Sequence, residues 1–141
     1  MSFVVTAVPV DQVSEAWQHA ARWLTPAVAR SGGRYDMAAL YRAVKHGGSV
    51  LWLVVDADGK VVAAMTTHIA HYPLKDILSV DFIGGRGVRK WLTEVTDTLD
   101  RVVRAHRLAG LETCARFGWK HLLAERGWTQ TMGFYERGNA S

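Results

Sequence analysis

The sequence has few of the features that stabilise secreted domains or bind metal ions. It contains one cysteine, Cys114, so the chain cannot form an internal disulfide. Its six histidines are scattered, and no cysteine–histidine group has the spacing of a metal site. We therefore expect a cytoplasmic protein without a bound metal.

Long apolar runs are also lacking. The longest, VLWLVV at residues 50–55, is far shorter than the roughly 20 residues that a membrane-spanning helix requires. The first segment, MSFVVTAVPVDQ, has no basic leader, and its apolar stretch is too short for a signal peptide. These observations predict a soluble protein that does not associate with membranes.

Charge of one sign is not concentrated in any long stretch. The formal net charge of +4 is compatible with an anionic ligand but lies well below that of a nucleic-acid-binding arm. The densest basic group is Arg86, Arg89 and Lys90. No base-stacking aromatic platform or recognition helix accompanies it, so we do not expect nucleic acid as a partner.

The apolar pattern predicts one domain over residues 1–141, because 49% of the chain is hydrophobic and no linker interrupts it. A β-branched run at 2–9 predicts a strand. Apolar residues recur with helical spacing in 11–30, where Pro26 is expected to end or kink the helix. Asp36 is expected to cap a second helix that stops at Gly47.

Three strands are predicted next, two of them joined by the turn sequence DADG and the third ending at residue 83. A long helix should run to about residue 109 and stop at Gly110. A short strand, a short helix and a last strand at 128–138 complete the chain. This order predicts a mixed α/β fold with a largely antiparallel central sheet and about four helices.

Three glycines fall within four positions in DFIGGRGVRKWL, residues 81–92. A strand that passes through Gly-x-Gly into a helix leaves the first backbone N–H groups of the helix free, and these groups bind anions. Gly85 and Gly87 would let a phosphate approach the backbone, and the basic residues nearby would add charge. The same pattern is typical of a plain tight turn, so both interpretations stay open.

This loop and the order of elements resemble the GNAT family of acyl-CoA-dependent N-acyltransferases. In that family R/Q-x-x-G-x-G/A follows the fourth strand, and its amides hold the pyrophosphate of coenzyme A. Gly85 and Gly87 match glycine positions, Gly84 stands where a basic residue or glutamine is usual, and Arg89 replaces the last glycine or alanine. An arginine there would either crowd the pyrophosphate or form a salt bridge with it.

The resemblance implies acetyl-CoA as the cofactor and a GNAT-type domain as the fold. It also implies a set of cofactor-binding residues along the fourth strand, the glycine loop and the segment before the last helix: Phe82, Ile83, Gly84, Gly85, Arg86, Gly87, Val88, Arg89, Lys90, Arg116 and Trp119.

The C-terminal part resembles the family in its spacing. Where members read N-x-x-A-x-x-L-Y-x-x-x-G-F, this chain reads RFGWKHLLAERGW, with Leu123 in place of the tyrosine that usually protonates the leaving thiolate. The segments HYPLKD, GGRGVRKWL, CARFGWKHLLAERGW and GFYER together resemble the GNAT-like proteins of tailed bacteriophages and prophages, over about residues 50–137. That resemblance implies the host cytoplasm or the virion as the location.

Acyl transfer to an amine needs a base, a donor to the thioester carbonyl and an acid for the thiolate. The base is expected to be Asp81, or Ser79 acting through water, although an aspartate beside a glycine turn is also typical of a cap. His68 and His71 would lie where the substrate groove opens, or simply be solvated. Tyr135 is the phenol expected to replace the missing acid, unless it only packs on the sheet.

Two functions follow. The first is a weak acetyltransferase that acts on a small-molecule or protein amine. The second is a catalytically silent phage protein that contacts other phage or host proteins in the virion, in assembly or in host interaction. Arg89 and Leu123 favour the silent protein, whereas Gly85 and Gly87 favour the enzyme. The pair Arg116 and Trp119 fits a pantetheine contact, an interaction surface or plain packing.

Overall fold

The hydrophobic pattern of the sequence yields strands and helices in nearly the expected order. The computed structural model describes residues 2–138. Its strands are β1 (Val4–Ala7), β2 (Val50–Val55), β3 (Val61–His71), β4 (Asp76–Gly85) and β5 (Leu111–Thr113). Its helices are η1 (Val10–Gln12), α1 (Val13–Ala29), α2 (Met37–Lys45), α3 (Val88–His106), η2 (Phe117–Trp119) and α4 (Lys120–Ala124). Within residues 2–138, none of the helices combines the length and the apolar character that crossing a membrane demands.

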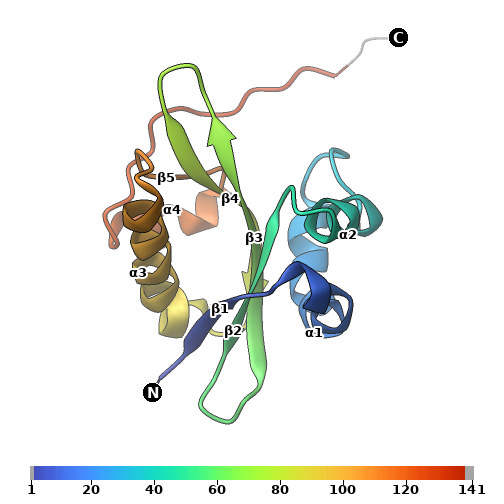
Figure 1. The fold of residues 1–141 in the computed structure, drawn as a ribbon. Helices are drawn as coiled ribbons and strands as arrows, with labels where there is room; N and C mark the ends of the chain where they lie inside the picture. Colours follow the sequence, from blue (N-terminus) through green and yellow to red (C-terminus); the bar gives the residue numbers. More distant parts are fainter. Residues whose placement is uncertain (1, 139–141) are drawn as a thin grey trace.

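The five strands form one sheet in the order β1-β2-β3-β4-β5. Neighbours from β1 to β4 are antiparallel, and β5 runs parallel to β4. The hairpin of β3 and β4 extends beyond the rest of the sheet (Figure 1). The predicted mixed, mostly antiparallel α/β domain is therefore confirmed.

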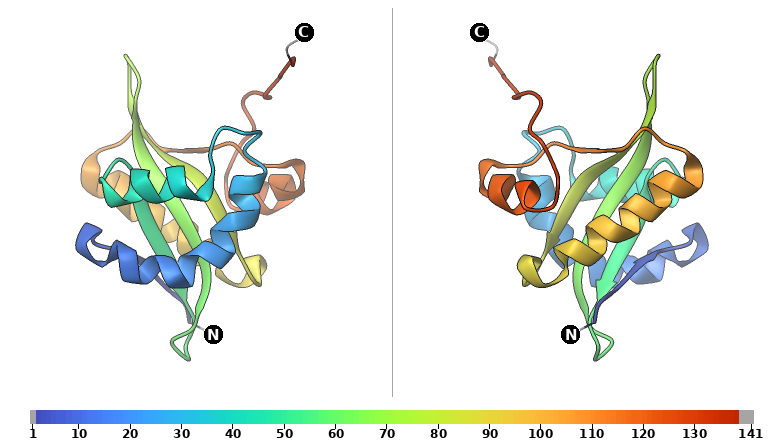
Figure 2. Two further views of the ribbon diagram at one scale, coloured as in Figure 1. Left: turned by 90° about the vertical axis from the view of Figure 1, so that its right-hand side faces the viewer. Right: turned by 90° about the vertical axis from the view of Figure 1, so that its left-hand side faces the viewer.

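Helices cover both faces of this sheet. The left view of Figure 2 shows α1 and α2 in front of the strands, and the right view shows α3 and α4 on the opposite face. Each layer buries its own apolar cluster, with Leu24, Leu40 and Leu51 on the α1 side and Trp91 and Leu99 on the α3 side. Full burial of such a side chain stabilises the fold by about 1.5 to 3 kcal/mol.

Two local signals act as the sequence predicts. Asp36 accepts a hydrogen bond from the amide of Ala39 at 2.7 Å and so caps α2. In the β2–β3 turn, the carboxylate of Asp56 accepts bonds from the amides of Asp58 and Lys60. The turn also places Gly59 at a φ of 82°, a conformation that glycine adopts without strain.

Of the two outcomes expected at Pro26, an end of the helix does not occur, and the predicted end of the long helix is wrong. Helix α1 continues through Pro26 to Ala29, because Leu24 and Val28 are buried on either side of the proline and tertiary packing outweighs the lost hydrogen bond. Helix α3 ends at His106 rather than near residue 109, since Arg107 adopts the left-handed conformation that terminates helices.

The predicted last strand at 128–138 does not form. This segment is irregular, and Met132, Phe134 and Tyr135 in it are exposed. A strand needs a neighbour along its whole length, and β5 offers only three residues. The segment therefore does not form the strand that its sequence favours.

Candidate functional site

The candidate site begins at an irregularity in β4. Thr67 of β3 pairs with Val80 and Thr66 pairs with Phe82, so Asp81 is an extra residue without a partner in the register. Such a β-bulge bends the strand and re-aims a side chain. On the other edge, β5 pairs with β4 only as far as Val80. Beyond this point β4 has no strand partner on that edge within the described part of the chain.

A cavity of about 1230 Å³ opens where β4 loses this partner. Its walls come from α1, β4, α3, the segment after β5 and the C-terminal segment. Many of the residues expected to form a site line it: His68, Ser79, Asp81, Phe82, Ile83, Gly84, Gly85, Val88, Arg116 and Trp119. Six others do not line it: His71, Arg86, Gly87, Arg89, Lys90 and Tyr135.

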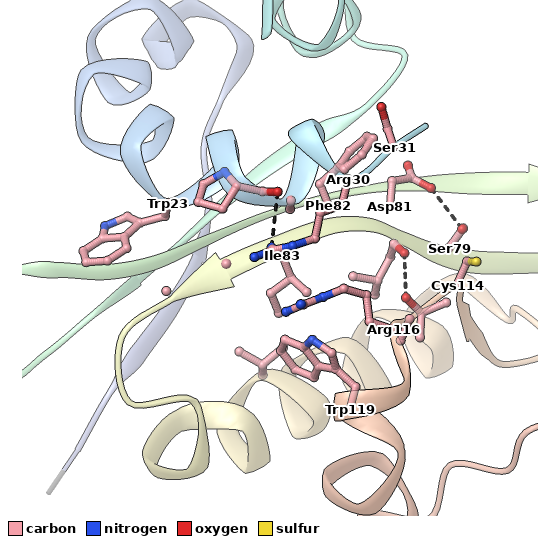
Figure 3. Close-up of a pocket in the computed structure, with 18 of the residues that line it drawn as sticks. Trp23, Arg30, Ser31, Ser79, Asp81, Phe82, Ile83, Cys114, Arg116 and Trp119 are labelled. Atoms are coloured by element: carbon pink, nitrogen blue, oxygen red, sulfur yellow. Dashed lines mark hydrogen bonds between the residues drawn. The ribbon is translucent and has the colours of Figure 1, made fainter. Parts of the chain in front are cut away.

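Three polar side chains on β3 and β4 form a connected group inside the cavity. Nδ1 of His68 lies 2.6 Å from Oδ2 of Asp81, and the hydroxyl of Ser79 donates to Oδ1 of Asp81 at 3.1 Å. Figure 3 shows the bond between Ser79 and Asp81. The side chains of His68 and Asp81 are 40% and 25% exposed. The pair is therefore partly exposed to solvent and accessible from the cavity that both residues line.

The hydrogen bond fixes the roles of the two ring nitrogens. A carboxylate can only accept, so Nδ1 of His68 carries the proton that bonds to Asp81. In the neutral ring this leaves Nε2 as the proton acceptor. Sequence reasoning placed the base on Asp81 and left His68 undecided, because the pairing depends on the β3–β4 register and its bulge.

The structure explains why glycine stands at each of the three positions of the loop. A Cβ at Gly84 would overlap the backbone oxygen of Trp23, because α1 crosses β4 there. A Cβ at Gly85 would lie 2.6 Å from the backbone oxygen of Val62 in β3. Gly87 has a φ of 71° and begins α3. Close packing and a left-handed turn thus account for all three glycines.

The loop nevertheless presents free backbone donors. The amide of Arg86 donates to the oxygen of Val62 at 2.9 Å, and the indole of Trp91 donates to the oxygen of Arg86 at 2.7 Å. These bonds hold the turn in place. Within residues 2–138, the amides of Gly87, Val88 and Arg89 have no acceptor. They fit an anion at the N-terminus of the 19-residue helix α3.

The basic side chains of the loop do not line the cavity. The guanidinium of Arg86 lies 5.8 Å from the centre of the Trp23 ring, on the α1 side. Arg89 is 70% exposed and its guanidinium lies 3.9 Å from a carboxylate oxygen of Glu125. Arg89 therefore neither fills the turn nor contacts its free amides.

The wall after β5 is held to β4 by one side-chain bond, from the hydroxyl of Thr113 to the oxygen of Val80 at 2.9 Å. Beyond it the chain turns, and Trp119 packs against the α3-side core. Figure 3 shows the side chain of Arg116 projecting into the opening near Ile83. Leu123, on α4, also lines this wall, so the position of the usual tyrosine is in the cavity but carries no hydroxyl.

The C-terminal segment returns to the loop between α1 and α2. Arg34 forms an ion pair with Glu136 at 3.1 Å, and its guanidinium lies 4.8 Å from the centre of the Phe134 ring. Phe134 and Glu136 line the cavity, whereas Tyr135 is 94% exposed and does not. The structure thus places the phenol of Tyr135 outside the site in which it was expected to act.

Solved structures share this fold at low sequence identity. An aminoglycoside acetyltransferase from an uncultured soil metagenomic sample has a TM-score of 0.70 and 12% identity, over 99% of this chain and 100% of its own. The glucosamine-6-phosphate N-acetyltransferase of Arabidopsis thaliana has a TM-score of 0.66 and 12% identity, over 98% and 99%. A mutant protein from Bacillus halodurans has a TM-score of 0.74 and 14% identity, over 96% and 99%.

The chain has the GNAT fold. No protein-family model and no curated protein matches its sequence. At such identities the likeness establishes the fold, and any activity has to be argued from the residues of the site.

Proposed function

We propose that this protein is an acetyl-CoA-dependent N-acetyltransferase of the GNAT family that acts on a primary amine. The observation that carries the proposal is the His68–Asp81 pair, which lines the cavity beside the β4 bulge. An amine must lose a proton before it can attack a thioester. A neutral histidine is the side chain best suited to accept that proton near pH 7.

In this proposal His68 is the general base and Asp81 is its positioning residue. Asp81 accepts a hydrogen bond from Nδ1–H of His68, which makes Nε2 the acceptor nitrogen of the neutral ring, and its charge stabilises the ring once Nε2 has taken the proton from the amine. Ser79 donates to the second oxygen of Asp81 and holds the carboxylate in place. The sequence predicted Asp81 as the base. This proposal assigns that role instead to His68, which Asp81 orients.

The residues present fit coenzyme A. The free amides of Gly87, Val88 and Arg89 would hold its pyrophosphate, and the wall of Arg116 and Trp119 would contact its pantetheine arm. Successive N–H groups of a strand point to opposite edges, so one backbone N–H among residues 82–84, on the edge of β4 that has no strand partner there, would donate to the acyl oxygen. When bound, acetyl-CoA supplies the acyl group as an activated thioester.

We infer that turnover is slow. Leu123 occupies the place of the family's acid, and Tyr135 lies outside the cavity. Loss of a positioned general acid typically costs on the order of 100- to 10,000-fold in rate. The sequence Arg116-Phe117-Gly118-Trp119, which precedes α4 here, supports the further proposal that the protein belongs to the GNAT-like proteins of tailed phages.

The test compares two histidines that each pair with an aspartate. We expect the protein to convert acetyl-CoA and a primary amine to the N-acetyl amine, detected by mass spectrometry, and expect His68→Gln to lower kcat/KM about 100- to 10,000-fold. His71 bonds Asp76 at 2.8 Å at the exposed end of the hairpin and does not line the cavity. His71→Gln should therefore leave the rate unchanged. Equal effects of the two substitutions would contradict the proposed base.

Two observations favour a second function. Packing and turn geometry explain all three loop glycines, and Leu123 removes the usual acid, as expected for a scaffold that has no catalytic role. Such a protein would act in the virion, in assembly or in host interaction through contacts with phage or host proteins. If calorimetry finds no binding of acetyl-CoA at millimolar concentration, the enzyme proposal fails and this second function is favoured.

A further inference from the structure

The side chains that line the cavity include more positive than negative charges. Four arginines line it and only two acidic residues: Arg22, Arg30, Arg34 and Arg116 against Asp81 and Glu136. Both carboxylates already have partners, since Asp81 bonds His68 and Glu136 bonds Arg34. The cavity therefore holds an excess of positive charge that the described residues do not neutralise.

Among these arginines, Arg30 is the best placed to bind a ligand in the cavity. It follows the last residue of α1, and its Nη1 donates to the backbone oxygen of Pro26 at 3.2 Å. Figure 3 shows this bond and shows the side chain of Arg30 lying between α1 and β4 near Ile83, and Arg30 lines the cavity. This bond uses one of the guanidinium N–H groups of Arg30.

Most of the donors of Arg30 are unused. A guanidinium has five N–H groups, and within residues 2–138 Arg30 makes one hydrogen bond and no ion pair. Carboxylates and phosphates are the groups that match the remaining donors in charge and geometry. Arg34 cannot serve in the same way, because Glu136 already occupies it.

We propose that the acceptor amine carries an anionic group, a carboxylate in the simplest case, and that Arg30 binds this group. The inference rests on the proposed acetyltransferase function and adds the substrate class. The same wall of the cavity then binds the anionic group and accepts the proton from the amine. Arg30 holds the anion, and His68, oriented by Asp81, takes the proton from the amine. The expected substrates are amino acids or other amino-carboxylates.

The test measures a preference rather than a rate, because the difference in amine basicity between a carboxylate and its carboxamide is the same for every variant and cancels when their preferences are compared. The substrates are β-alanine and 4-aminobutanoate, each compared with its carboxamide, and the product is the N-acetyl compound measured by mass spectrometry. We expect the parent protein to prefer the carboxylates, and expect Arg30→Gln to lower that preference in kcat/KM about 10- to 100-fold. Arg30→Lys should retain part of it.

Arg22→Gln is the matched control. Arg22 also lies on α1 and lines the cavity, but its guanidinium lies 4.3 Å from the centre of the Trp23 ring. This substitution should leave the preference unchanged. Both arginines are exposed, so neither glutamine variant should unfold, and thermal denaturation checks this.

The outcomes separate the two proposals. Equal kcat/KM for carboxylate and carboxamide, or a preference that survives Arg30→Gln, overturns the assignment of Arg30 and leaves the acetyltransferase proposal standing. If no amine is acetylated, whether anionic, neutral or cationic, the acetyltransferase proposal fails and the assignment of Arg30 fails with it.

Discussion

The two walls of the cavity are built from different kinds of structure. The first wall, made of α1 and the end of the β3–β4 hairpin, rests on the buried side chains Leu24 and Val28 and carries the His68–Asp81 bond. The second wall, made of the segment after β5 and α4, follows a three-residue strand. It leaves Phe117 89% exposed.

This difference separates two steps of the proposed reaction. The group that accepts the proton is pre-organised by the sheet, so it needs no rearrangement when the amine arrives. In the wall assigned to the pantetheine arm, Trp119 packs against the core but none of residues 114–124 is fully buried, so the stability of this wall depends more on what binds there. We therefore expect substitutions in the first wall to affect folding and proton transfer, and those in the second wall to affect cofactor binding.

The largest effect is expected from a comparison of two glycines, one on each wall. Gly84→Ala places a Cβ onto the backbone oxygen of Trp23, and neither backbone can yield cheaply. We expect the free energy of unfolding to fall by about 1 to 3 kcal/mol or more, measured by urea denaturation. Gly118→Ala, where an added Cβ meets nothing within 4 Å, should change it by less than about 0.5 kcal/mol.

Similar losses of stability in these two variants would show that the walls do not differ in packing. Retention of full stability by Gly84→Ala would show that α1 can move away from β4 at little cost. In either case, close packing of the first wall could no longer explain why the group that accepts the proton is held in place before the amine arrives.

A smaller effect is expected when the missing acid is restored on the second wall. Leu123 lines the cavity at the position of the family's tyrosine. We expect Leu123→Tyr to raise kcat for acetyl transfer about 10- to 100-fold, less than a fully evolved acid provides, since the new phenol has no supporting contacts. Leu123→Phe supplies the ring without the hydroxyl and should give no gain.

An equal gain from phenylalanine and tyrosine would attribute the effect to packing of α4 rather than to proton donation. Tyr135→Phe should not alter the rate in either background, because Tyr135 does not line the cavity.

The smallest effect is expected at Arg89. Its guanidinium is exposed and lies near Glu125 rather than over the free amides of the turn. We expect Arg89→Ala to change the affinity for coenzyme A by less than about fivefold, measured by calorimetry, since an exposed charge interaction is worth at most about 1 kcal/mol. A tenfold stronger or weaker affinity would mean that Arg89 moves onto the pyrophosphate when the cofactor binds.

The sequence alone determined the features that depend on neighbouring residues. Helical spacing of apolar residues predicted α1 and α3, Asp36 predicted the cap that begins α2, and DADG predicted the β2–β3 hairpin. Gly-x-Gly before a helix predicted a turn with free amides. These features need only local chemistry, because the atoms that interact are a few residues apart in the chain.

Only the tertiary structure decided the features that depend on residues distant in the chain. The bond between His68 and Asp81 requires the β3–β4 register and its bulge, and the packing that keeps α1 helical through Pro26 requires the opposing core. Arg30 reaches the cavity because α1 crosses β4 at Gly84, and the segment 128–138 stays irregular because β5 is too short to pair with it. Local propensity cannot encode these outcomes, since each depends on which surfaces meet when the sheet and its two helical layers pack together.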